Sequence, residues 1–117
     1  MTRQIEKPWG HEEIWAETDR YVGKILFITA GHRLSMQHHE MKDETIRVLR
    51  GSMRLELEDE QGIMQVISCE PGNAVHIATM RKHRMQAVTD VELLEVSTTE
   101  LDDVIRHEDD YGRSGNG

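Results

Sequence analysis

Short runs of apolar and β-branched residues, each ended by a turn signal, follow one another along almost the whole chain. In the clearest run, Met53, Leu55 and Leu57 alternate with charged residues, which is the period-two pattern of a strand with one buried face. Many short strands at close spacing favour an all-β sandwich or barrel. Strands are expected at residues 11–17, 21–29, 34–39, 45–49, 53–58, 63–68, 74–77, 84–88 and 91–97, with a hairpin loop at 59–62 and a short helix at 100–106.

The composition describes a single small domain, residues 1–117, of which residues 113–117 are expected to form a disordered tail. The residues are 37% hydrophobic and 31% charged, which allows a real hydrophobic core. The net charge of −8 argues against a nucleic-acid-binding surface, which needs a basic patch. It leaves room for a small phosphorylated ligand held by a few inward Lys and Arg side chains.

Two further features restrict the compartment and the kind of metal site. Cys69 is the only cysteine, so neither an intramolecular disulfide nor a zinc site built from cysteines is expected. The N-terminal residues are polar and no apolar run approaches transmembrane length. We therefore expect a cytoplasmic protein with no membrane partner.

Polar residues that bind metals are concentrated between Gly31 and Gly51. If residues 34–39 form a regular strand, Gln37 and His39 share one face with Arg33 and Ser35, whereas Leu34, Met36 and His38 lie on the other. A polar row directed into a barrel is costly unless something satisfies it. A metal ion bound by His39, with Glu44 supplying a carboxylate, would do so.

The same stretch resembles the first cupin motif, G-x5-H-x-H-x3-4-E-x6-G, and places its ligand positions on Gln37, His39 and Glu44. Most cupins have a histidine at the position of Gln37. The C-terminal cupin domain of type II mannose-6-phosphate isomerases has a glutamine there, in a signature similar to R-L-S-L-Q-x-H, and residues 33–39 read R-L-S-M-Q-H-H. Residues 7–10 resemble the R-P-W-G entry of that family, and residues 108–113 read as its closing E-D-D-Y-G-R.

A second motif completes the expected metal site. The chain resembles G-x5-P-x-G-x2-H-x3-N from Gly72 onward, which places the last ligand on His83, although residues 78–80 read A-T-M and Ala87 stands at the asparagine position. The resemblance implies a cupin double-stranded β-helix (jelly-roll barrel) in free-standing form, without the nucleotidyltransferase domain of the bifunctional enzymes. It also implies a divalent ion, with Zn as first choice and Mn, Co, Ni or Fe as alternatives, on Gln37, His39, Glu44 and His83.

The resemblance further implies a metal-dependent sugar-phosphate isomerase that converts mannose 6-phosphate to fructose 6-phosphate through an enediolate. Lys24 and Arg84 are the expected catalytic cations, which would stabilise the enediolate or hold the phosphate. The alternatives to a catalytic role are that Lys24 lies on an edge strand with its ammonium group in solvent, and that Arg84 forms a surface salt bridge. The general base is left open between His76 and Glu95.

Two other functions and an assembly state complete these expectations. Two histidines and one carboxylate also suit an iron-dependent oxygenase. The A-T-M loop, and Thr45-Ile46 where the family has H-W, favour a non-catalytic cupin that binds a sugar or metabolite. We expect a homodimer with Leu34 and Met36 among its contacts, because an open sheet edge risks aggregation.

Overall fold

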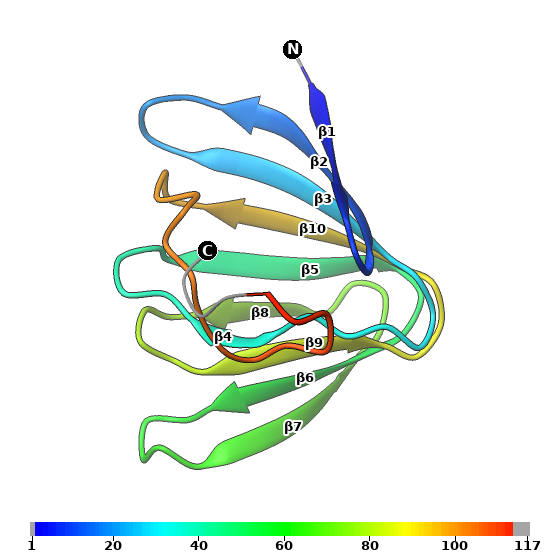
Figure 1. The fold of residues 1–117 in the computed structure, drawn as a ribbon, viewed down its shortest axis with the longest axis vertical. Coiled ribbons are helices and arrows are strands. Elements are labelled where there is room, and N and C mark those ends of the chain that lie inside the picture. Colours follow the sequence, from blue (N-terminus) through cyan, green and yellow to red (C-terminus); the bar gives the residue numbers. More distant parts are fainter. Residues whose placement is uncertain (1, 114–117) are drawn as a thin grey trace.

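The computed structural model describes residues 2–113. Within these residues the strands form two antiparallel sheets that pack on one another (Figure 1). Sheet A has the order β1 (Arg3–Lys7), β2 (Gly10–Glu17), β3 (Val22–Ile28), β10 (Val91–Ser97), β5 (Glu44–Arg50) and β8 (Ala74–Ile77). Sheet B has the order β11 (Ile105–Glu108), β4 (Met36–His38), β9 (His83–Ala87), β6 (Met53–Glu58) and β7 (Met64–Cys69). The predicted all-β jelly-roll architecture is confirmed.

The inner faces of the two sheets supply the hydrophobic core. Met53 and Leu55 on β6 are buried, and Leu57 packs against the same cluster, as the alternation in the sequence predicts. They meet Leu93 from β10 and Ile46 from β5 in the opposite sheet. Each fully buried side chain of this size contributes about 1.5–3 kcal/mol of hydrophobic stabilisation. The hydrophobic core occupies one part of the barrel interior, and a polar pocket lies in the other part.

The predicted C-terminal helix is wrong, and two strands were not predicted. Residues 98–104 form turns, and β11 then pairs with β4 at the edge of sheet B. An isolated helix of this length is marginal, whereas an open strand edge gains backbone hydrogen bonds from a partner. At the other end, β1 pairs with β2 as an edge hairpin. Within residues 2–113, no helix is long and apolar enough to cross a membrane.

The predicted tail begins with a residue that is held in place. Arg113 forms an ion pair with Asp109, with its Nε 2.9 Å from Oδ2. The rest of the predicted tail, residues 114–117, lies outside the described residues.

A β-bulge corrects the expected orientation of Leu34. Arg33 bridges Gln86 and Gln37 pairs with His83, so four steps along one strand match three along the other. The extra residue lets Leu34 enter the core, with 7% of its surface exposed, while Gln37 still faces inward. The expectation that Leu34 lies outward and contacts a second subunit is therefore wrong.

Candidate metal centre

Three of the four predicted ligands come together between the sheets. His39 follows β4, Glu44 opens β5 and His83 opens β9. One ligand atom from each lies within 4.8 Å of the other two, and all three residues are buried. Nε2 of His39 and Nε2 of His83 lie 3.6 and 3.4 Å from the same oxygen, Oε1 of Glu44.

The hydrogen bonds of the two histidines leave their inner nitrogens available for a metal. Nδ1 of His39 lies 2.6 Å from the carbonyl oxygen of Asp103, and Nδ1 of His83 lies 3.0 Å from that of Arg81. Because a carbonyl only accepts, each Nδ1 carries the proton and the lone pair of the neutral ring is on Nε2. Among residues 2–113, neither buried Nε2 atom has a hydrogen-bond partner.

A divalent cation fits this arrangement. It would satisfy two buried nitrogen lone pairs and a carboxylate that otherwise face one another. Metal-binding histidines commonly donate their second nitrogen to a backbone carbonyl, as both do here. Two imidazoles and one carboxylate suit Zn, Mn or Fe.

The surroundings of Glu44 favour the charged carboxylate that a metal ligand requires. Burial alone would raise its pKa, but the adjacent imidazoles of His39 and His83 and the charge of Lys42 hold the pKa of Glu44 well below its usual range. Its Oε2 lies 3.0 Å from Nζ of Lys42, while Oε1 faces the two histidines. One oxygen of the carboxylate therefore faces the candidate metal position.

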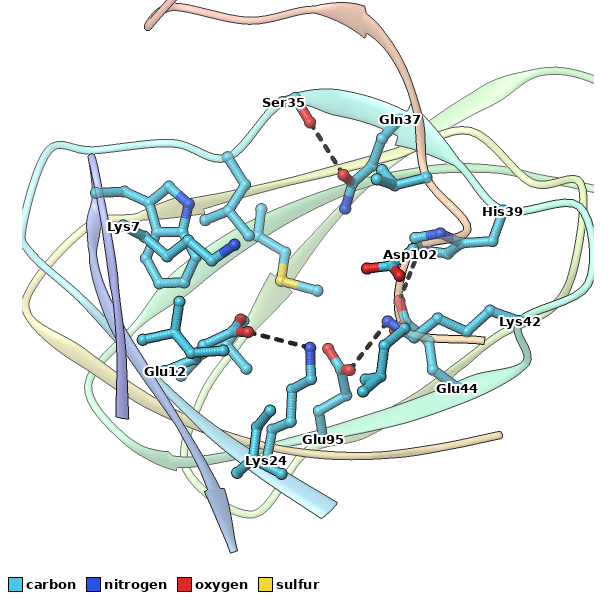
Figure 2. Close-up of a pocket in the computed structure, with 18 of the residues that line it drawn as sticks. Lys7, Glu12, Lys24, Ser35, Gln37, His39, Lys42, Glu44, Glu95 and Asp102 are labelled. Carbon is cyan, nitrogen blue, oxygen red and sulfur yellow. Dashed lines mark hydrogen bonds and ion pairs between the residues drawn. The ribbon is translucent and has the colours of Figure 1, made fainter. Parts of the chain in front are cut away.

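Gln37 lines the same pocket, but its amide is turned differently from a metal ligand. Oε1 of Gln37 accepts a hydrogen bond of 3.0 Å from the Ser35 hydroxyl (Figure 2). A half-turn of the amide would exchange the positions of Oε1 and Nε2, and the Ser35 hydroxyl could then accept from Nε2. The fourth ligand therefore stays a prediction.

The pocket beside these residues has a volume of about 240 Å³. A row of alternating charges crosses it: Glu12, Lys24, Glu95, Lys42 and Glu44 (Figure 2). Nζ of Lys24 lies 3.2 Å from Oε1 of Glu12, and Nζ of Lys42 lies 3.1 Å from Oε2 of Glu95. The sequence indicated Lys24, Glu95 and Glu44 as candidate pocket residues but gave no signal for Glu12 or Lys42.

Burial and neighbouring charges shift the pKa values of Glu95 and Lys42. Burial and then the neighbouring Glu44 charge raise the pKa of Glu95. For Lys42, burial lowers the pKa, but the Glu95 and Glu44 carboxylates outweigh it and the net shift is upward. The surroundings thus favour the charged form of Lys42 and the protonated form of Glu95.

The altered loop before His83 keeps a backbone conformation typical of glycine. Met80, at the glycine position of the motif, has a φ of 64°. Its N–H donates to the carbonyl oxygen of His39 at 2.7 Å. A left-handed conformation costs a residue other than glycine about 1–2 kcal/mol. The loop therefore supports the metal ligand His39 despite its changed sequence.

Arg84 and His76 lie outside the pocket, which corrects two expectations. Because successive residues of a strand face opposite ways, the inward orientation of His83 turns Arg84 outward. Its Nε donates to the carbonyl oxygen of Leu34 at 3.0 Å, so the guanidinium lies outside the pocket where it was expected. His76 is exposed on β8 and lies 2.7 Å from Asp43, which excludes it as the general base of this pocket.

The closing motif, residues 108–113, fastens the end of the chain to sheet B. Arg84 donates to the carbonyl oxygen of Glu108 at 3.1 Å. Arg33 forms a bidentate pair with Asp110, in which Nε lies 2.6 Å from Oδ2 and Nη2 lies 2.9 Å from Oδ1. The hydroxyl oxygen of Tyr111 lies 2.9 Å from Nδ1 of His32. Arg33 was expected on the inner surface with Arg84, but it too binds the closing motif on the outer face of sheet B.

Two sheets enclosing a buried His–Glu–His group define a cupin barrel. Similar solved structures include KdgF from Halomonas sp. (TM-score 0.72, 20% identity, 86% of this chain and 88% of that one). An oxalate decarboxylase from Bacillus subtilis matches with a TM-score of 0.72 and 19% identity over 86% of this chain and 28% of that one. These likenesses concern the fold.

Sequence comparison then identifies the family. The family described as "Mannose-6-phosphate isomerase C-terminal" matches residues 1–109, and the chain belongs to it. The mannose-1-phosphate guanylyltransferase ManC of Salmonella typhimurium is 29% identical over 97% of this chain. The chain spans about a quarter of the length of this relative, 24%.

Proposed function

We propose that this protein is a metal-dependent sugar-phosphate isomerase, with mannose 6-phosphate as the first substrate to test. The observation that carries the proposal is the buried His–Glu–His group beside Glu95 and several basic side chains, in a chain of the isomerase family. Isomerisation of an aldose to a ketose moves a proton between neighbouring carbons and needs no external oxidant. A metal site and one group that exchanges protons are sufficient for such chemistry.

His39, Glu44 and His83 would hold the divalent ion, with Gln37 as the proposed fourth ligand. When bound, the ion supplies Lewis-acid polarisation of the substrate carbonyl. The oxalate decarboxylase with a similar fold is described with Mn(II) centres, so Mn should be tested beside Zn, Co, Ni and Fe.

Glu95 is the proposed proton-transfer residue. Its carboxyl group is buried in the pocket, and its raised pKa brings it closer to neutral pH than an ordinary glutamate. Lys42 at 3.1 Å fixes its position. Lys24 lies opposite Glu95 in the β3–β10 register and lines the same pocket, where its ammonium group would stabilise a developing oxyanion.

The test is turnover by the purified protein loaded with each metal in turn. We expect interconversion of mannose 6-phosphate and fructose 6-phosphate, its loss on chelation, and its recovery on metal addition. Glu95→Gln should lower kcat by about 10²–10⁴-fold without loss of bound metal. Glu56→Gln, on the outer face of β6, is the matched control and should retain wild-type kcat.

Two outcomes would overturn parts of this proposal. Wild-type protein that holds metal but turns over no sugar phosphate is not an isomerase. Ligand binding without turnover would then identify the binding module, and oxygen consumption would identify the oxygenase. A Glu95→Gln variant as active as wild type would refute Glu95 as the proton-transfer residue.

A further inference from the structure

β1 and the C-terminal segment bring basic side chains to the pocket. Lys7 reaches in from β1 (Figure 2). Arg106 and Arg113 line the pocket from the C-terminal segment, residues 101–113. The chain as a whole has a net charge of −8, yet these three cations line one cavity. Such a local excess of positive charge attracts an anion.

Strand register explains why Arg106 points inward. It pairs with Gln37 across β11 and β4, and Gln37 pairs with His83 across β4 and β9. Directly paired residues share a face of the sheet, so Arg106 shares the inward face with the metal ligand His83. Two strand spacings of about 4.8 Å put the Cα atoms of Arg106 and His83 about 10 Å apart.

Two of these cations have no ion-pair partner among residues 2–113. Lys7 and Arg106 take part in no salt bridge there, and Nε of Arg106 is buried without a hydrogen-bond partner. A buried donor without a partner is costly. Burial, and then the charge of Arg113, also lower the pKa of Arg106.

Arg113 is held differently. Asp109 accepts from its Nε and Nη2, each at 2.9 Å, and its guanidinium carbon lies 5.7 Å from the centre of the Tyr111 ring. This pairing leaves Nη1 of Arg113 free of hydrogen bonds to the residues described. The closing motif thus positions Arg113, which lines the pocket, and leaves part of its guanidinium unpaired with the described residues.

We propose that Lys7, Arg106 and Arg113 form a phosphate-binding subsite on the side of the pocket that is lined by β1 and the C-terminal segment. The subsite would take the phosphate monoester of a sugar phosphate, so it rests on the proposed function. It replaces Arg84, whose side chain lies outside the pocket, as the predicted phosphate contact. Arginine presents a planar fork that suits phosphate oxygens.

The experiment measures binding, separately from turnover. Calorimetry with inorganic phosphate, mannose 6-phosphate and mannose is performed on metal-loaded protein, with metal content and thermal unfolding recorded for each variant. Arg106→Gln and Lys7→Gln should each weaken mannose 6-phosphate binding about tenfold to a hundredfold, because each removes a charge-assisted hydrogen bond. Mannose binding should change less. Arg54→Gln, exposed on the outer face of β6, removes the same charge and should change neither.

The outcomes separate this subsite from the isomerase proposal. Loss of phosphate binding in the variants of a protein without turnover supports the subsite and rejects the isomerase. Normal turnover with unchanged KM in both variants rejects the subsite and retains the isomerase. Failure of the wild type to bind inorganic phosphate and mannose 6-phosphate also overturns the subsite.

A separate observation concerns the outer face of sheet A. Trp15 is 44% exposed and Val96 is 46% exposed there. The strand registers join Glu13, Ile25, Leu94 and Arg47 into one row across β2, β3, β10 and β5. The row has an acid at one end, two apolar side chains in the middle and a base at the other end.

This row is complementary to its own copy. A two-fold axis parallel to the strands, between β3 and β10, would put Ile25 over the partner's Leu94 and Glu13 over the partner's Arg47. Such a pairing is isologous, as in most homodimers. We infer that this face, in place of the predicted Leu34 contact, forms the interface of a homodimer.

Charge exchange tests this interface by sedimentation. Glu13→Arg alone and Arg47→Glu alone should each lower the dimer fraction, because like charges would then face each other. The double variant should restore it. A wild-type monomer at high concentration, or a double variant no better than the singles, would overturn the inference.

Discussion

Lys42 is the residue whose removal should most clearly expose the energetics of the pocket. Its side chain is 7% exposed, and Nζ lies 3.0 Å from Glu44 and 3.1 Å from Glu95. Lys42→Met removes the cation and leaves two buried carboxylates near each other. Loss of one partner from a buried ion pair costs about 3–5 kcal/mol. We expect at least that loss in the free energy of unfolding at pH 7, a large fraction of the total stability of a small domain.

The pH dependence follows from the pKa shifts. The pKa of Lys42 is raised in the folded state, so its contribution is fully present at pH 7, below its ordinary pKa of 10.5. Without Lys42 the pKa of Glu95 should rise further. The resulting destabilisation exists above the ordinary glutamate pKa of 4.5 and shrinks as the pH falls toward it.

Urea denaturation of metal-free protein at pH 7 and pH 4.5 measures this difference. Lys82→Met, at an exposed position, is the control and should stay within about 0.5 kcal/mol of wild type. A Lys42→Met loss below about 1 kcal/mol at pH 7, or equal losses at both pH values, would refute the buried-pair reasoning.

Three further predictions concern single positions. Met80→Gly should raise the free energy of unfolding by about 1 kcal/mol, because glycine relieves the φ of 64°; unchanged or lower stability in urea would contradict the assigned strain. Gly51→Ala should destabilise by more than 1 kcal/mol, because φ is 83° and a Cβ would lie 2.0 Å from the Asp90 carbonyl oxygen; a wild-type melting curve would show that the loop adapts. His83→Ala should abolish stoichiometric metal binding with the β-sheet circular dichroism retained; wild-type metal content would exclude His83 as a ligand.

The sequence was most informative where burial imposes a strict pattern. Alternation gave β6 its inward Met53 and Leu55, and motif spacing placed His39, Glu44 and His83, which the structure brings together. These predictions succeed because a core face and a set of ligands both require fixed spacing. The strand boundaries also follow from the turn residues that separate the runs.

What the sequence did not show depends on pairing across the fold. The bulge before Gln37 changes the orientation of Leu34, and no local pattern distinguishes it from a regular strand. Lys42 lies in a connection, where no periodicity indicates that it is buried. Arg84 was placed inward although His83, its neighbour, was also placed inward; strict alternation would have revealed the conflict.

The C-terminal segment contacts both the candidate metal centre and the proposed phosphate subsite. The carbonyl of Asp103 orients His39, and three residues later Arg106 lines the proposed subsite. A ligand that favours the docked segment at one site lowers the free energy needed to order it at the other. Such coupling is reciprocal: phosphate should raise the affinity for metal by the same factor by which metal raises the affinity for phosphate. Residues 101–113 would then couple metal binding to phosphate binding.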